Sequence, residues 1–171
     1  MHSLSLYLFL LVGISAVLAA PAEETTTAQP KCPPSSIETH LLSNGKKYFF
    51  HKEWSNFDKA KNFCQRNNGR LPILDTREDL DVVRAKAGKI SGVAWWVDAS
   101  DEGREPGQYR WANGKELPLN SSLWFKQAKQ PNSFGPGQRT CVTFSTWYGD
   151  LLWDESCGKS QFVVCQANDG C

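Results

Sequence analysis

The sequence predicts a small α+β domain that is cross-linked by disulfides. Two segments in its first half carry apolar residues at helical spacing, whereas from Gly92 onward short apolar stretches alternate with Gly, Pro, Asn and Asp. Six cysteines follow an apolar N-terminal segment, and an even cysteine set is typical of disulfides in secreted chains. The length of 171 residues fits one domain with a short tail.

The N-terminal segment is predicted to be a signal peptide. The apolar run over residues 4–20 is shorter than the about 20 residues of a membrane span, and it contains the small-residue cleavage pattern Val17-Leu18-Ala19. We expect cleavage after Ala19, with Ala20 as the alternative, so that residues 1–19 are removed and the protein is secreted. An uncleaved signal anchor is the competing interpretation.

Residues 20–31 are predicted to form a disordered spacer, because this stretch of Thr, Pro and Ala is too polar to bury a core. The domain then spans residues 32–171. No second hydrophobic segment follows, so we expect no membrane span in the mature chain. The net charge of +1 gives no indication of nucleic acid or a charged membrane surface as partner.

The first helix is predicted from a capping box formed by Ser55 and Asp58. Its apolar face then carries Phe57, Ala60 and Cys64, which places Cys64 toward the core. The stretch Asn67-Asn68-Gly69 ends it.

A second helix is predicted to begin at Thr76, again with an acid three residues later at Asp79. Leu80, Val83 and Ala87 form its apolar stripe. Gly88 is a natural stop.

Short strands are predicted on both sides of a long irregular stretch. Between Trp111 and Arg139 the sequence shows little regular structure, and a loop of that length usually has a function of its own. The expected strands cover Lys47–His51, Ala94–Asp98, Tyr109–Trp111, Arg139–Phe144, Leu151–Asp154 and Gln161–Gln166.

Several motifs occur in the order seen in one family. They are Trp96-Val97-Asp98-Ala99, the turn Tyr109-Arg110-Trp111-Ala112-Asn113-Gly114, Trp124, the triplet Gln130-Pro131-Asn132, and Cys141, Trp153, Cys157 and Cys165. Together they resemble the C-type lectin-like domain, over roughly residues 32–171. The resemblance implies the C-type lectin-like fold: two helices and antiparallel strands with a long ligand-binding loop.

The resemblance also implies a disulfide pattern. It pairs Cys64 with Cys165 and Cys141 with Cys157. Cys32 and Cys171 remain, and because the ends of this fold lie close together we expect them to bridge. The alternative is a link between chains, so the protein is expected to be a monomer or a disulfide-linked dimer.

In sugar-binding members of this family, a calcium ion on the long loop holds two sugar hydroxyls. The resemblance implies a cis bond between Gln130 and Pro131, which aims the flanking side chains the same way. With two carboxylates where the family has three, calcium should bind weakly. The implied calcium ligands are Gln130, Asn132, Gln138, Asp154 and Glu155.

An auxiliary calcium site of some members is only half matched. Asp101 and Glu105 stand at its first two acids, whereas its other positions hold Ser133 and Gln138. A solvated acidic loop is the alternative interpretation.

The triplet Gln-Pro-Asn combines the mannose-type Glu-Pro-Asn with the galactose-type Gln-Pro-Asp and assigns neither specificity. The implied sugar contacts are Gln130, Asn132, Asp154, Glu155 and the aromatic Phe134 and Trp147, with Tyr148 beside it. The remaining aromatics at family positions, namely Trp95, Trp96, Trp111, Trp124 and Trp153, are expected to pack in the core.

These observations predict a secreted lectin that binds glycans or glycoproteins, as in innate immune recognition, with calcium as its expected cofactor. The alternative is a protein-binding domain that has lost calcium and sugar. An enzyme is not expected, because the mature chain has only His40 and His51 as histidines and no serine-nucleophile elbow. Asn120 opens a glycosylation sequon in the long loop.

Overall fold

The computed structural model describes residues 31–133, 135–147 and 151–171. The predicted signal peptide and all of the spacer except Lys31 lie outside these residues and stay predictions. Phe134 and Tyr148 also lie outside them. Within the described residues, no helix has the length and apolar character needed to cross a membrane.

The described chain builds one mixed sheet with two α-helices. The strands follow the order β1-β2-β8-β4-β6-β7, with β3 beside β8 and β5 beside β4; β4 and β8 run parallel and the other pairs are antiparallel. This confirms the predicted α+β class. The elements are β1 (His40–Leu41), β2 (Lys47–Ser55), α1 (Phe57–Arg66), β3 (Gly69–Arg70), α2 (Arg77–Gly88), β4 (Ala94–Ser100), β5 (Arg110–Trp111), the 3-10 helix η1 (Lys126–Ala128), β6 (Thr140–Ser145), β7 (Leu152–Ser156) and β8 (Gln161–Ala167).

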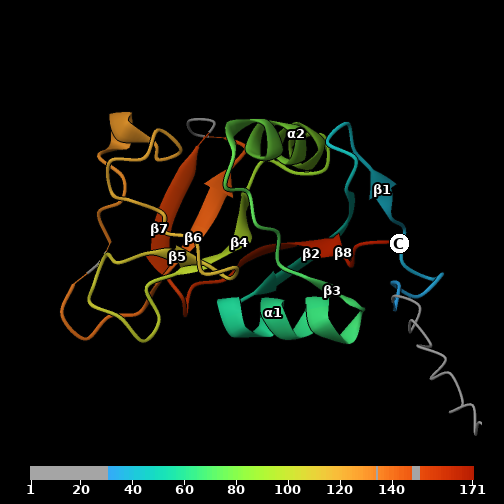
Figure 1. Cartoon of the computed structure of the whole chain (residues 1–171), viewed down its shortest axis with the longest axis horizontal. Coiled ribbons are helices and arrows are strands. Elements are labelled where there is room, and N and C mark those ends of the chain that lie inside the picture. Colours follow the sequence, from blue (N-terminus) through green and yellow to red (C-terminus); the bar gives the residue numbers. More distant parts are fainter. Residues whose placement is uncertain (1–30, 134, 148–150) are drawn as a thin grey trace, which may run out of the picture.

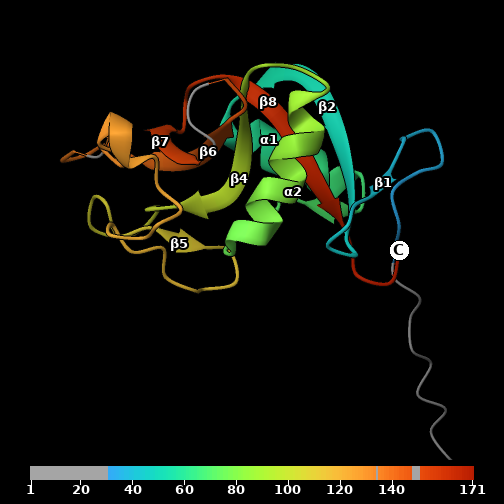
Figure 2. The same ribbon diagram turned by 90° about the horizontal axis from the view of Figure 1, so that it is seen from above.

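The two helices cover opposite faces of the sheet, as Figures 1 and 2 show. Helix α2 buries its predicted stripe in one apolar cluster together with Trp95 and Phe144. Helix α1 buries Phe57 and Cys64 in a second cluster on the other face, together with Trp96. Both predicted apolar stripes are therefore confirmed, and the sheet separates two cores.

The predicted start of helix α1 is wrong. Its N-cap is Asn56, whose side-chain oxygen accepts a hydrogen bond from the backbone N–H of Lys59 at 3.0 Å. Ser55 remains in β2, where it pairs with Gln161 across the ladder. Asn caps a helix as well as Ser does, so the sheet pairing decided which residue took the role. The predicted cap of α2 is confirmed, because Thr76 Oγ1 accepts from the N–H of Asp79 at 3.1 Å.

The other predicted strands lie close to their expected positions, except that β2 continues beyond His51 to Ser55. The short elements β1, β3 and η1 were not predicted. The tryptophans at family positions are buried, with Trp95, Trp96 and Trp124 fully enclosed. Trp153 differs from this expectation. It is only partly buried and packs against the ring of Phe125, with 5.2 Å between centroids.

The structure contains the three expected disulfides. Cys64–Cys165 joins α1 to β8, and Cys141–Cys157 joins β6 to the turn after β7. Cys32–Cys171 closes the two ends of the domain within one chain, as favoured from the sequence. In Figure 1 the C-terminus lies at the end of the molecule opposite the long loop. Any ligand site on that loop is thus remote from the termini.

Candidate functional site in the long loop

The long loop connects β5 to β6, and η1 is the one helical element among its described residues. It is tied to the sheet by a bridge between Trp124 and Leu152 on β7. The Gln130–Pro131 peptide bond is cis, as predicted. The triplet that follows η1 therefore lies directly beside β7.

Gln130 and Asn132 contact β7 in different ways. The side chain of Gln130 is 5% exposed, and its Oε1 accepts a hydrogen bond from the backbone N–H of Asp154 at 3.0 Å. Asn132 donates its backbone N–H to Asp154 Oδ1 at 2.8 Å and its side-chain amide to the carbonyl of Ala128 at 3.0 Å. The Asn132 side chain is exposed. Only Asn132 of this pair therefore offers polar atoms to a ligand.

Asp154 is the centre of this contact. Its carboxylate is 1% exposed, and Oδ2 accepts from the backbone N–H of Ser133 and from the hydroxyl of Tyr109, both at 2.7 Å. Ser133 Oγ also donates to the Asp154 carbonyl at 3.0 Å. We call Asp154, Tyr109, Asn132 and Ser133 the Asp154 cluster. It ties the loop to the sheet through protein donors alone.

Tyr109 extends this cluster into the core. Its hydroxyl lies 2.8 Å from Thr140 Oγ1. Burial is the largest cause that raises the pKa of Tyr109, and the neighbouring carboxylate of Asp154 adds to it. The phenol therefore stays protonated at neutral pH and remains a hydrogen-bond donor to Asp154.

Asp101, the first acid of the predicted auxiliary calcium site, also accepts hydrogen bonds from the protein. Asp101 is 3% exposed and accepts from the N–H of Thr140 at 2.8 Å, from its hydroxyl at 2.7 Å and from the N–H of Gly107 at 3.2 Å. Glu105, its predicted companion, is exposed. The buried Asp101 thus fastens the acidic loop to the start of β6.

Glu155 and Gln138 are not brought to the Asp154 cluster. Successive side chains on a strand point to opposite faces, so Glu155 on β7 faces away from Asp154 and pairs with Lys159. Gln138 is exposed and lines a cavity of about 440 Å³ together with residues of α1, such as Asp58. The predicted ligand set is therefore divided between two sides of the hairpin.

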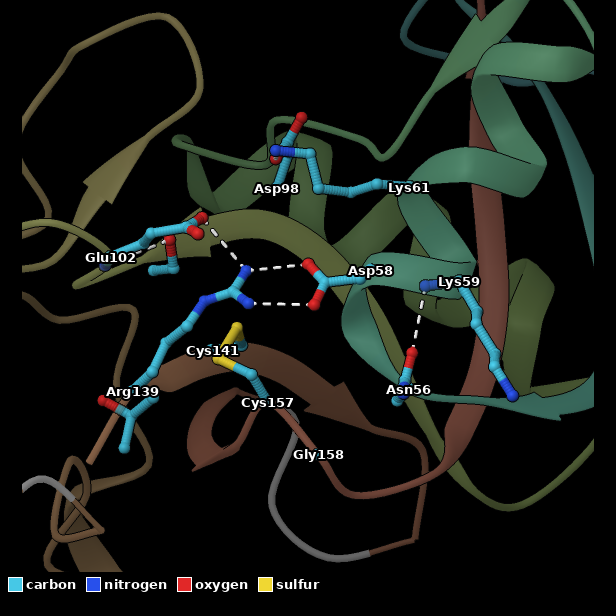
Figure 3. A network of polar contacts seen from close by, with 12 residues as sticks. Asn56, Asp58, Lys59, Lys61, Asp98, Glu102, Arg139, Cys141, Cys157 and Gly158 are labelled. Atoms are coloured by element: carbon cyan, nitrogen blue, oxygen red, sulfur yellow. Dashed lines mark hydrogen bonds and ion pairs between the residues drawn. A yellow bond between two sulfur atoms is a disulfide. The ribbon is translucent and has the colours of Figure 1, made fainter. Parts of the chain in front are cut away.

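An ion-pair network borders the cavity lined by Gln138. Arg139 donates to both oxygens of Asp58 at 2.9 Å and to Glu102 at 3.0 Å, as Figure 3 shows. Its guanidinium also lies over the ring of Phe57, 5.5 Å from the centroid. The hydrogen bonds from Arg139 are the main cause that holds the pKa of Asp58 below 3.8. This network connects α1 to the C-terminal end of the long loop and to the segment between β4 and β5.

These residues do not fit a calcium ion. Calcium takes about six to eight oxygen ligands, several of them carboxylates, whereas three protein donors already occupy the Asp154 carboxylate. Glu155 and Gln138 face elsewhere. Among the described residues, no group of three or more His, Cys, Asp and Glu side chains is arranged to hold a metal.

Trp147 lies apart from Asn132. It is 75% exposed, and its indole rests on Gly92, where a Cβ atom would come within 2.4 Å of Nε1. Asp154 pairs with Val142, five residues before Trp147, which corresponds to about 17 Å along a strand. The structure therefore does not bring these two predicted sugar contacts together.

Sequence reasoning missed three functional neighbours of the loop. Tyr109 was identified only as part of a turn motif, and the roles of Thr140 and Arg139 were not predicted. No sequence pattern indicates which residue a hydroxyl or guanidinium group will hydrogen-bond. The contacts of Tyr109 with Thr140 and Asp154 can be recognised only when the pairing of the strands is known.

The chain was compared with known proteins. Residues 53–167 match the family model described as "Lectin C-type domain". "Salivary C-type lectin 1" of Aedes albopictus is 28% identical over 170 residues, covering 93% of this chain and 96% of the relative. Human "C-type lectin domain family 17, member A" is 29% identical over 134 residues, which is 78% of this chain but 32% of that protein.

Solved structures show the same architecture. The C-type lectin TC14 of the tunicate Polyandrocarpa misakiensis aligns with a TM-score of 0.63 at 24% identity, covering 71% of this chain and 96% of that one. The carbohydrate-recognition domain of cow CD23, solved in the presence of GlcNAc2Man3 oligosaccharide, aligns with a TM-score of 0.59 at 26% identity, covering 74% and 90%. The chain belongs to the C-type lectin domain family, whose members are binding domains and not enzymes.

Proposed function

We propose that this chain is an extracellular carbohydrate-binding protein that recognises glycans or glycoproteins through the long loop. The observation that carries the proposal is the state of Asn132. Its side chain is exposed, while its backbone is fixed by the buried Asp154. A polar group held in one orientation loses little conformational entropy on binding, which favours recognition of sugar hydroxyls.

The family match and the three disulfides support the proposal, since disulfides persist in oxidising extracellular compartments. Gln130 acts in this proposal as the buried support of Asn132. Trp147 and Glu155 stay predicted sugar contacts. Because Trp147 lies far along the hairpin from Asn132 and Glu155 faces away from Asp154, they would contact other residues of an extended glycan. Asn120 is exposed and stays a predicted glycosylation site.

The test is a glycan array probed with the secreted protein, its Asn132→Ala variant and an Asn62→Ala control. Asn62 is an exposed asparagine on α1, remote in sequence from the loop. We expect the Asn132 variant to bind at least about tenfold more weakly, which corresponds to the loss of about one hydrogen bond. The Asn62 variant should bind as the wild type does. Equal binding by both variants would move the site away from the triplet.

A second candidate is recognition of a protein. It is favoured by Trp54, which is 59% exposed at the end of β2 and packs against Phe162 with 4.7 Å between centroids. Exposed tryptophans are frequent anchors of protein interfaces. Absence of signal on the glycan array, from correctly disulfide-bonded protein, would favour this candidate.

A further inference from the structure

A loop of this length needs contacts that hold it against the sheet. A long irregular segment must keep its cis-proline turn in one conformation beside β7. In this chain a buried carboxylate lies beside the loop and accepts hydrogen bonds from the loop and from Tyr109. Two backbone N–H groups and one phenol converge on Asp154, each at 2.8 Å or less.

The carboxylate is satisfied without a cation. An ionised carboxylate offers about four lone-pair positions, and three of them receive hydrogen bonds here. Hydrogen bonds to a charged acceptor are about twice as strong as neutral ones, and their strength increases where water is excluded. Only Oδ1 retains a free position, so a calcium ion could take both oxygens of Asp154 only by displacing a donor from Oδ2.

The backbone of Asp154 also forms hydrogen bonds with side chains of the loop. Gln130 Oε1 accepts from the backbone N–H of Asp154, and Ser133 Oγ donates to the Asp154 carbonyl. Residue 154 therefore uses its N–H, its carbonyl and its carboxylate to hold the loop on both sides of the proline. Gln130 suits this role, because its oxygen accepts from an N–H without adding a second buried charge.

The geometry points to a loop that Asp154 fastens in place of a metal ion, so that this protein recognises its ligand without calcium. The first part of this inference concerns the loop alone. The second part rests on the proposed carbohydrate function.

Thermal unfolding of the secreted wild-type protein tests the first part. Because a ligand that binds only the folded state raises the melting temperature, a resident calcium site would make Tm depend on calcium. We expect the same Tm in millimolar calcium chloride and in EDTA. A reproducible increase of several degrees in calcium would overturn the inference.

Two variants test whether Asp154 holds the loop against the sheet. Asp154→Asn keeps the shape of the side chain but turns an amide group toward a donor, so we expect Tm to fall by several degrees in both buffers. Glu155→Gln is the matched control on the other face of β7 and should leave Tm unchanged. If both substitutions changed Tm only in the presence of calcium, the two acids would be metal ligands and the inference would be wrong.

If Asp154→Asn does not fold, Tyr109→Phe removes a single donor to Oδ2 and should lower Tm by a smaller amount in both buffers. A lowering seen only in calcium would contradict the inference.

The glycan array, run in calcium and in EDTA, tests the second part. Equal glycan binding in both buffers supports the inference. Binding that is lost in EDTA overturns it while the proposed function stands. Absence of glycan binding in both buffers overturns the proposed function instead, and the Tm comparison then decides the inference about the loop.

Discussion

The long loop and the α1 side of the sheet are fastened by different means. On the α1 side, the disulfides Cys64–Cys165 and Cys141–Cys157 cross-link the chain, and Arg139 adds a bidentate ion pair with Asp58 (Figure 3). No cysteine lies between residues 112 and 139. There the loop is held without a covalent link, by the Asp154 cluster and by the burial of Leu123 and Trp124 in the core.

The disulfides and the Asp154 cluster act on different states of the protein. A disulfide stabilises mainly by restricting the unfolded chain, so its effect depends on the length of chain that it closes. A buried polar cluster exists only in the folded state, and it stabilises only when every donor and acceptor has its partner. Single substitutions on the disulfide-linked α1 side should therefore change the stability little. In the loop, the loss of a single hydrogen-bonding group should lower it measurably.

The largest effect is expected from the disulfides. Replacing both Cys64 and Cys165 by Ala opens a crosslink that spans 101 residues, and replacing Cys141 and Cys157 opens one that spans 16. The chain-entropy estimate is a loss of about 4.7 kcal/mol for the first and about 3 kcal/mol for the second. Urea unfolding measures both. The opposite order would show that native packing, rather than the unfolded chain, controls this side.

A smaller loss of stability is expected when the hydroxyl of Tyr109, beside the loop, is removed. Tyr109→Phe removes a donor to a buried carboxylate, which should cost about 1.5–3 kcal/mol. Tyr48→Phe is the matched control, because Tyr48 is also fully buried but its hydroxyl accepts from the neutral amide of Asn44, a bond worth about 1 kcal/mol. The same urea experiment compares them.

The two tyrosines should also separate in ligand binding. Tyr109→Phe is expected to weaken glycan binding, because it loosens the support of Asn132, whereas Tyr48→Phe should not. Equal effects of the two variants on stability and binding would show that the Asp154 cluster has no special role.

The smallest effect is expected from the ion pair on the α1 side. The folded-state pKa of Asp58 lies below its unfolded value of 3.8, chiefly because of Arg139. Ionised Asp58 therefore stabilises the fold above about pH 4, and this contribution disappears as the pH falls through the folded-state value. Since Asp58 is largely exposed, the contribution should stay below about 1 kcal/mol.

Arg139→Gln tests this contribution. The variant should be slightly less stable than the wild type at pH 7, and the difference should decrease as the pH falls below about 4 and through the folded-state pKa of Asp58. Thermal unfolding over that range measures it, at low salt so that screening is weak. A difference that did not change with pH over the acid range would assign the effect of Arg139 to its packing on Phe57 instead.

Much of the fold followed from spacing in the sequence. The stripe of Leu80, Val83 and Ala87 identified the buried face of α2, because helical periodicity fixes which side chains share a face. The position of Cys64 on the buried face of α1 followed in the same way. The start of α1 did not, because Ser55 and Asn56 are comparable caps and the pairing of β2 with β8 chose between them.

The candidate site was only partly predictable. The family resemblance identified the triplet at residues 130–132 and its cis bond. The alternation of β7 would have separated Asp154 from Glu155, but the sequence alone does not say where a strand begins to alternate. The predicted calcium set therefore combined side chains that the strand directs to opposite faces.

The sequence by itself determined which side chains of the two helices are buried, because helical periodicity fixes which residues share a face. The expected disulfide pairs came from the family resemblance. Only the tertiary structure decided how the acids are used. The donors to Asp154 come from Ser133, Asn132 and Tyr109, which are 21, 22 and 45 residues away along the chain. Whether a carboxylate binds a metal or a neighbour depends on which groups folding places around it, and no local pattern contains that information.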